Sequence, residues 1–333
     1  MADVAKLAGV SHQTVSRVLN DHPSVRPATR QRVLDAMAEL AYTPNRLARA
    51  LVTRRSGLLG VVTSGSAKYG PMSTLIAVEE AARAAGYAVN VAVVRSPTQE
   101  SMGAVLASFD EQAVEGVVVI APRATAVEAL RAVDSRAPVI LVAAGVGTDE
   151  RFATVSVDQA RGARLAVEHL VSLGHRTVAH VSGPDDWFDA RERLAGWRSA
   201  LAEAGLEGEL VEGDWTADVG YTAGRQLVAD GVPGAIFAAN DQLALGLLRA
   251  FAEAGVAVPG DVSVVGFDDI EGTAHFFPPL TTVRQDFTRL GEVCLEVLLA
   301  AIAAGSTTAS AAPEPVAPEL VVRSSTGPPS ASS

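Results

Sequence analysis

From about residue 57 onward, short apolar runs alternate along the chain with longer Ala-rich segments. Most of the apolar runs are rich in β-branched residues and nearly free of polar ones, which is typical of strands covered on both faces. The predicted strands cover residues 58–62, 88–94, 116–120, 139–142, 177–181, 235–238 and 262–265. The helical segments between them include residues 74–85, 159–173, 190–204, 219–229 and 241–254.

This alternation of strands and helices predicts an α/β fold with parallel sheets and right-handed helical crossovers. The region holds too many elements for one compact flavodoxin-like unit, so we expect two doubly wound lobes. Ligands of such folds bind at the carboxyl ends of the strands. The sequence therefore predicts a ligand cleft between the two lobes.

Residues 1–55 have a different pattern, with short helical segments and no strands. Ser11 is a suitable N-cap for a helix over residues 12–19, which follows a turn at Gly9-Val10. Its Val15, Val18 and Leu19 share one face. The opposite face carries His12, Gln13, Ser16 and Arg17.

A third helix over residues 27–40 supplies Val33, Met37 and Leu40 to a small core. This arrangement is typical of a helix-turn-helix, whose second helix meets base edges in the major groove. Gln suits adenine, Arg suits guanine or phosphate, and Ser suits either. The alternative is a plain helical bundle with a solvated polar face.

The distribution of charge supports nucleic-acid binding by the N-terminal segment. The whole chain carries a formal net charge of −11. Residues 1–55 hold nine basic and four acidic residues, a net charge of +5, so the remainder carries −16. A basic segment joined to an acidic body is typical of a DNA-binding module attached to a separate domain.

Several classes of protein are disfavoured by the sequence. Cys294 is the only cysteine and lies in an apolar stretch, so we expect a buried thiol and no intrachain disulfide. No secretory signal and no apolar run of about 20 residues is present, which predicts a cytoplasmic protein without membrane contact. Phosphate-binding loops, nucleophile elbows and zinc-type His spacing are also missing, so we expect no enzymatic activity, no cofactor and no metal.

Polar side chains gather after four of the predicted strands or at the start of a helix. Vicinal hydroxyls of a carbohydrate are met well by planar groups: Arg193 donates, Asp268 accepts and Asn240 does both. Trp215 offers a flat apolar surface to the C–H face of a sugar ring. Each residue alone also has a structural explanation, as an ion pair, a helix cap or a core side chain. The adjacent acids Asp268 and Asp269 also leave open a sugar-metabolising enzyme on the same frame.

Two groups of motifs resemble the lac repressor (LacI/GalR) family of transcriptional regulators, closest to its lac repressor branch. The first is DVAKLAGVSHQTVSRVLN with RPATRQRVLDAMAELAYTPNRLARAL, and the second is RLAGW, EGDW, ANDQLALG and PPLTTVRQDF in the body of the chain. The resemblance implies a helix-turn-helix headpiece on a periplasmic-binding-protein-like core, acting as a repressor of double-stranded operator DNA. It implies base reading by His12, Gln13 and Arg17, with His12 in place of the branch's tyrosine.

The segment after the headpiece resembles the family's hinge helix. Asn45 is a plausible cap because Pro44 disfavours helix upstream, yet the segment is too short for a stable isolated helix. The resemblance implies that the helix orders in the DNA minor groove beside that of a dimer partner. Arg46 and Leu51 would also contact DNA there, with Leu51 wedging between base steps.

The resemblance also implies a set of effector contacts and a symmetric homodimer. The implied contacts are Ser64, Pro71, Arg193, Trp215, Asn240, Asp268 and Gln285. Ala143-Ala144 replaces an aspartate of the branch, and Lys68 replaces an apolar pocket residue. The resemblance implies a galactoside or a related glycoside as the effector. The two departures leave another glycoside or a disaccharide as alternatives, and action with a co-repressor is also open.

These observations predict four parts of the chain. The expected parts are a headpiece over residues 1–44, a hinge over 45–55, an effector core over 56–325 and a disordered tail over 326–333. The first lobe is expected at about 57–155 and 286–314, and the second at about 156–285 and 315–324. Residues 304–318 are low in complexity and predict an exposed loop. No leucine-heptad helix follows the last strand, so we expect a dimer and not a tetramer.

Overall fold

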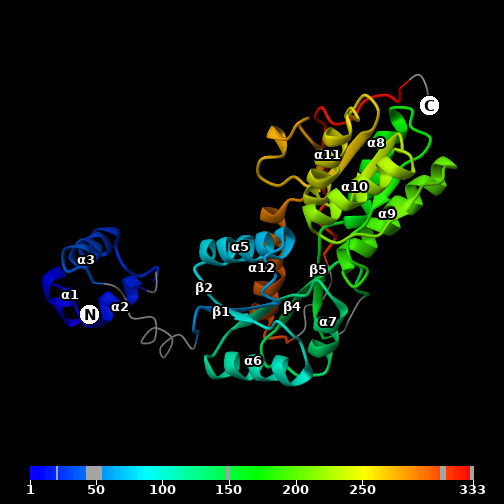
Figure 1. Ribbon diagram of the computed structural model, residues 1–333. Helices are drawn as coiled ribbons and strands as arrows, with labels where there is room; N and C mark the ends of the chain where they lie inside the picture. The colour runs from blue at the N-terminus through cyan, green and yellow to red at the C-terminus, as the bar shows by residue number, and fades with distance from the viewer. Residues whose placement is uncertain (20–21, 43–54, 148–150, 308–312, 331–333) are drawn as a thin grey trace. The chain divides into compact units, whose positions relative to one another are not determined.

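The computed structural model describes residues 1–19, 22–42, 55–147, 151–307 and 313–330 (Figure 1). Its contacts divide the chain into two compact units, Met1–Gly57 and Leu58–Ser333. The fold class is the one that the sequence predicts: a small helical headpiece and a larger α/β core built from two parallel-sheet lobes. Among the described helices, none is both long and apolar enough to cross a membrane.

The headpiece packs three helices around a core of valines and alanines. They are α1 (Ala2–Ala8), α2 (His12–Leu19) and α3 (Pro27–Glu39). Val4, Val15 and Val33 are fully buried at its centre. Leu40 was expected in this core but is 42% exposed, because α3 ends at Glu39 and leaves it outside the helix.

The first lobe contains a five-stranded parallel sheet in the order β2-β1-β3-β4-β5. The strands are β1 (Leu58–Thr63), β2 (Ala88–Val93), β3 (Gly116–Ile120), β4 (Val139–Val142) and β5 (Ala153–Val155). One face is covered by α5 (Tyr69–Ala84) and α12 (Phe287–Ala304), and the other by α6 (Gln99–Glu111) and α7 (Ala124–Arg131). Burial on both faces explains why β1, β3 and β4 are almost purely apolar, whereas the edge strand β2 is mostly apolar but partly exposed.

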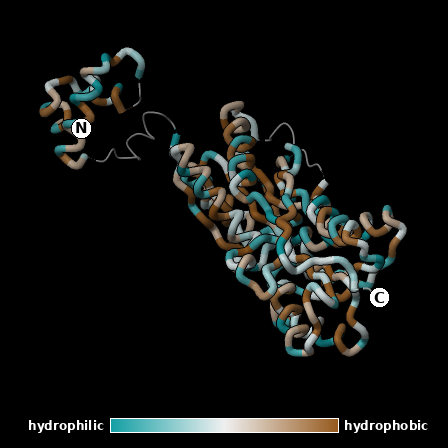
Figure 2. The backbone as a smooth tube through the Cα atoms, turned by 90° about the horizontal axis from the view of Figure 1, so that it is seen from above, coloured by the Kyte–Doolittle hydropathy of each residue, from teal (hydrophilic) through white to brown (hydrophobic). Residues whose placement is uncertain are grey.

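The second lobe contains a six-stranded sheet in the order β11-β10-β9-β8-β6-β7. The strands are β6 (Ala179–Val181), β7 (Leu210–Val211), β8 (Ala235–Ala238), β9 (Ser263–Asp268), β10 (Thr281–Arg284) and the antiparallel edge strand β11 (Glu319–Val321). One face packs on α8 (Gln159–Ser172) and α9 (Phe188–Ala204), and the other on α10 (Ala217–Asp230) and α11 (Asp241–Ala254). A short 3-10 helix, η1 (Thr273–His275), precedes β10. Figure 2 shows hydrophobic stretches in the interior of the larger unit, Leu58–Ser333.

In the described part of the chain, the elements change lobe after β5, after β10 and between α12 and β11. Two of the crossing segments lie side by side, since Asp158 N–H donates to Val316 O and Val316 N–H donates to Ser156 O. Val316 is buried by this pairing, so the expectation of an exposed loop over 304–318 is wrong at this residue.

The expected disorder from residue 326 is also wrong for residues 326–330, which the structure describes. Gly327 N–H donates to Ser263 Oγ at 3.0 Å, and Thr326 Oγ1 lies 2.9 Å from His169 Nε2. These bonds supply partners for the buried Ser263 hydroxyl and the half-buried imidazole. Buried polar groups need such partners, which is why this small-residue segment is ordered.

Candidate functional site

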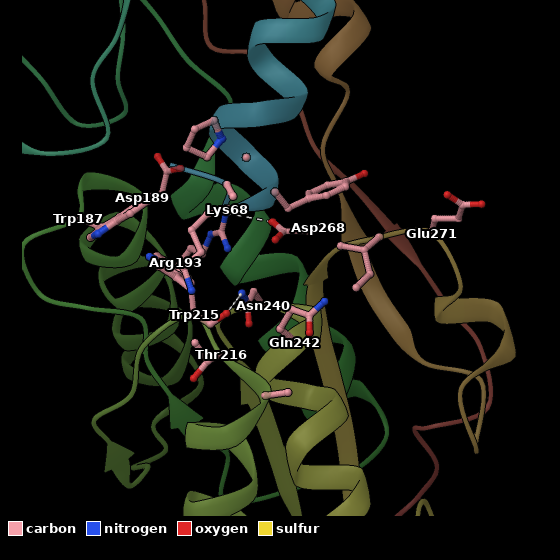
Figure 3. A pocket seen from close by; sticks show the side chains of 16 residues that line it. Lys68, Trp187, Asp189, Arg193, Trp215, Thr216, Asn240, Gln242, Asp268 and Glu271 are labelled. Carbon is pink, nitrogen blue, oxygen red and sulfur yellow. Dashed lines mark hydrogen bonds and ion pairs between the residues drawn. The ribbon is translucent and has the colours of Figure 1, made fainter. Parts of the chain in front are cut away.

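A cleft of about 610 Å³ opens between the two lobes, at the carboxyl ends of the second sheet's strands (Figure 3). Its first wall is the segment 67–71 at the start of α5. Its second wall carries the polar residues that follow β8 and β9 and the amino-terminal part of α9. The structure thus brings together segments more than 200 residues apart in the sequence.

Arg193 lies at the centre of the second wall and is only 3% exposed. From the second turn of α9, its guanidinium donates to Gln159 Oε1 at 2.9 Å, to Ala239 O and to Asp268 Oδ1 at 3.3 Å. Its carbon Cζ also lies 3.8 Å from the centre of the Phe267 ring. These contacts hold the guanidinium in one orientation, and they leave part of its five N–H groups for a ligand.

Asp268 ends β9 with an unusual backbone conformation. Its φ is 109° and that of Asp269 is 52°, a region that non-glycine residues seldom adopt and that is often found at binding sites. Its Oδ1 accepts from Arg193 and from Gln285 Nε2, the latter at 2.7 Å. Its Oδ2 has no hydrogen-bond partner among the described residues. Burial raises the pKa of Asp268 to about 6, although Arg193 and Gln285 act in the opposite direction.

Asn240 and Trp215 complete the polar cluster. Asn240 caps α11, because its Oδ1 accepts from Leu243 N–H at 2.9 Å. Its Nδ2 makes one long contact, 3.4 Å, with Trp215 O. The Trp215 indole lines the cleft beside these groups, with the Arg193 Cζ 5.4 Å from its ring centre. The cluster therefore offers donors, acceptors and an aromatic surface within one small volume.

The other predicted effector residues take different places. Pro71 lines the cleft from the first turn of α5. Gln285 lines a smaller adjoining hollow and reaches the cluster through its bond to Asp268. Ser64 is not among the lining residues of the cleft; its Oγ is buried and has no partner in the part of the chain that the structure describes.

Sequence reasoning missed two cleft residues on α9. The sequence pattern predicts a helix from residue 190, whereas α9 begins at Phe188. Trp187 therefore becomes the N-cap residue and Asp189 belongs to the first turn, and both line the cleft (Figure 3). An aromatic residue and an acid two positions apart, just before the RLAGW motif, were the available signal.

The polar face predicted for the second helix lies on α2, on the side opposite its buried valines. Val15 and Val18 are buried against the other helices, while His12, Gln13 and Arg17 are exposed and Ser16 is half-buried. The helix begins with Ser11 Oγ accepting from Thr14 N–H at 3.1 Å. The predicted hinge residues Asn45, Arg46 and Leu51 lie outside the described residues.

Comparison with known families matches both units. The family described as bacterial regulatory proteins, lacI family, matches residues 1–45, and a periplasmic binding protein-like domain matches residues 167–326. The lactose operon repressor of Escherichia coli K12 is 40% identical over 303 residues, covering 89% of this chain and 83% of that protein. The chain belongs to the LacI family.

Further comparisons support the assignment of this protein to the LacI family. The regulator CelR of Thermobifida fusca is 37% identical, with 92% of each chain covered. The structure of the lac repressor dimer bound to operator and the anti-inducer ONPF matches with a TM-score of 0.79 and 36% identity over 98% of each chain. The CelR–cellobiose complex matches with a TM-score of 0.71 and 32% identity. Family membership identifies the chain as a DNA-binding transcriptional regulator and not an enzyme.

Proposed function

We propose that this LacI-family protein is a cytoplasmic homodimeric repressor that leaves its operator when a small glycoside fills the cleft. The observation that carries the proposal is the buried Arg193–Asp268 pair at the wall of the cleft, in which Asp268 Oδ2 has no hydrogen-bond partner among the described residues. A sugar hydroxyl donates to that oxygen, and the free N–H groups of Arg193 donate to its neighbour. Asn240 adds a donor, and Trp215 supports the C–H face of the ring.

The DNA-binding part of the proposal rests on the exposed polar face of α2. His12, Gln13, Ser16 and Arg17 are the residues that would meet bases and phosphates in the major groove. We assign the headpiece to residues 1–44 and the hinge to residues 45–55. Within this hinge, Asn45, Arg46 and Leu51 would contact the minor groove.

Effector binding is coupled to DNA through the angle between the lobes. The amino end of α9 is fastened to the first lobe, because Phe188 N–H donates to Pro122 O at 3.0 Å and its side chain packs against the first lobe's core. Arg193, one turn later, holds the strand ends of the second lobe. A ligand that pulls on both walls therefore changes the lobe angle and the spacing of the paired hinges. A typical coupling of about 1–3 kcal/mol corresponds to about 5–150-fold in operator affinity.

The test is a gel-shift titration with candidate operators, repeated with a panel of galactosides and glucosides. Asp268→Asn should retain operator binding and lose release by sugar, because it removes the charged acceptor. Arg17→Ala should lose operator binding, whereas Arg83→Ala, which removes an equal charge from the exposed surface of α5, should not. A monomeric protein, or equal retention on any duplex with and without sugar, would refute the proposal.

A further inference from the structure

Asp241 is a fully buried acid at the start of α11, directly after the cluster residue Asn240. Its exposed fraction is 0%, and it is not among the residues that line the cleft. Burying a carboxyl group is costly unless hydrogen bonds satisfy its oxygens. The partners of Asp241 therefore indicate what this side chain does.

The two oxygens of the Asp241 carboxyl bind different segments of the second lobe. Oδ2 accepts from Ile270 N–H at 2.9 Å, in the turn that follows β9. Oδ1 accepts from the hydroxyl of Thr282 on β10. Asp241 itself follows β8. One carboxyl group thus joins the three chain segments that deliver the polar side chains of the cluster, which are Asn240, Asp268 and Gln285.

A glycine on β9 makes room for this carboxyl group. Gly266 is the register partner of Thr282 in the pairing of β9 with β10. A Cβ atom at Gly266 would lie 2.2 Å from Asp241 Oδ1, which is far shorter than any van der Waals contact. Only glycine at this position lets the carboxyl group lie against the two strands.

The turn after β9 needs a partner of this kind. Asp268 and Asp269 adopt φ angles of 109° and 52°, and such conformations persist only when the surrounding structure holds them. The Asp269 carboxylate is held by two arginines. The bond from Ile270 N–H to Asp241 holds the other end of the turn. Without it, the Asp268 carboxylate loses a constraint on its position.

We infer that Asp241 is a positioning residue for the effector cluster, which fixes the turn that aims Asp268 without itself touching the effector. Groups that bind a ligand must be held within about 0.5 Å of the productive geometry, by packing and by hydrogen bonds from the residues behind them. The inference rests on the proposed function for its sugar-binding readout. It extends the binding machinery to a residue outside the cleft.

The asparagine variant is the conservative replacement for this role. Burial raises the pKa of Asp241 well above its ordinary value and the charge of Asp268 raises it further, although the bonds from Thr282 and Ile270 lower it. The raised pKa favours the neutral acid, which an amide resembles in size and in having one donor and one acceptor. In Asp241→Asn the amide oxygen would accept from Ile270 N–H, and the amide nitrogen would donate to the Thr282 hydroxyl.

The first test measures amide hydrogen exchange of the full chain by mass spectrometry and needs no sugar. In Asp241→Ala, the amides of residues 268–271 should exchange about tenfold faster or more, because the turn opens locally. Asp241→Asn should stay within about threefold of the wild type. Equal protection of this segment in the wild type and in Asp241→Ala would overturn the inference.

The matched control is Asp261→Ala. This exposed acid of the same lobe also accepts from a backbone N–H, that of Ala257, at 2.8 Å, and it does not line the cleft. Its removal should leave the exchange of residues 268–271 and the sugar affinity unchanged. An effect as large as that of Asp241→Ala would show that any lost bond in the lobe suffices, and the inference would be wrong.

The second test is isothermal titration calorimetry with methyl β-galactoside or methyl β-glucoside, whichever binds the wild type. Asp241→Ala should weaken binding about tenfold or more, and Asp241→Asn less than about threefold. Asp268→Asn should cost a much smaller factor in the Asp241→Ala background than in the wild type, because Asp268 is already displaced. Trp215→Leu should cost the same factor in both backgrounds. Independent, multiplicative losses for Asp241 and Asp268 would contradict the positioning role.

Failure of this inference is distinguishable from failure of the proposed function. If no galactoside or glucoside releases candidate operators from the wild type, the proposed function is wrong, and the exchange experiment alone decides the role of Asp241. If sugars release operator while Asp241→Ala keeps its protection and affinity, the function stands and the positioning role is wrong. Should Asp241→Ala not fold, Thr282→Val removes one of the two bonds with little change of shape and must show the same pattern at reduced size.

Discussion

Replacing Arg193 with alanine tests both the site and the stability of the second lobe. The side chains of Arg193 and Asp268 are 3% and 8% exposed, so their ion pair is sheltered from water. Arg193→Ala removes the guanidinium and leaves the Asp268 carboxylate with Gln285 as its one remaining donor among the described residues. Breaking a buried pair from one side costs about 3–5 kcal/mol, because the remaining charge is uncompensated.

The size of this loss depends on pH. With Arg193 present, burial already raises the pKa of Asp268 to about 6, and removing the cation raises it further. Unfolded Asp has a pKa near 3.9. In the folded Arg193→Ala variant, the Asp268 carboxyl is neutral at a pH below its pKa, and its burial then costs little. At a pH above that pKa, the folded variant must hold an unpaired buried charge. The destabilisation by Arg193→Ala therefore grows as the pH rises from about 5 to about 8.

Urea unfolding followed by tryptophan fluorescence measures this difference, since all three tryptophans lie in the second lobe. The double variant Arg193→Ala/Asp268→Asn should recover about 1–3 kcal/mol of the loss at pH 8 and little at pH 5, because it removes the stranded charge. A loss for Arg193→Ala that is equal at both pH values, and that Asp268→Asn does not relieve, would refute the reasoning.

Three further outcomes are expected. Arg17→Ala should weaken operator binding by about 1–3 kcal/mol in gel shifts while leaving sugar affinity unchanged; an unaltered operator affinity would contradict base reading by α2. Sugar affinity, measured by calorimetry, should fall as the pH is lowered through about 6, since protonation removes the negative charge that makes Asp268 a strong acceptor. Equal affinity at pH 5 and 8 would exclude Asp268 as a charged acceptor. Gly196→Ala should lower the free energy of unfolding, measured by urea titration, by about 1–3 kcal/mol, because the new methyl group meets the Ala160 carbonyl of α8. Gly103→Ala on α6, which adds only an ordinary contact to Val133, should leave this free energy nearly unchanged.

Local patterns in the sequence predicted seven of the eleven strands that the structure describes and several of its helices. These seven strands are mostly continuous apolar runs, as expected of strands covered on two faces. The two-residue strand β7, Leu210–Val211, is partly exposed at an edge of the sheet, and no periodicity marks it. Its pairing depends on β6, which is distant in the sequence.

The polar cluster was predictable because its members follow strand ends, and the carboxyl ends of parallel strands meet at one edge. Asp268 illustrates this, since it ends β9, whereas Arg193 reaches it from the second turn of α9 in the same lobe. Trp187 and Asp189 could not be found this way, because the start of α9 depends on Phe188 docking against the other lobe. Tertiary contacts, not local propensity, decide such helix ends.

The segment after β11 has a consequence for the geometry of the cleft. Ser325 Oγ accepts from Thr281 N–H at 2.8 Å and Ser325 O accepts from Val264 N–H at 2.8 Å, so this segment clasps the beginnings of β9 and β10. The opposite ends of these two strands deliver Asp268 and Gln285. The segment after β11 therefore fixes the alignment of β9 and β10, whose carboxyl-end residues Asp268 and Gln285 are joined by a hydrogen bond. Weakening the contacts of Ser325 would disturb the geometry of the proposed sugar site from the opposite end of the sheet.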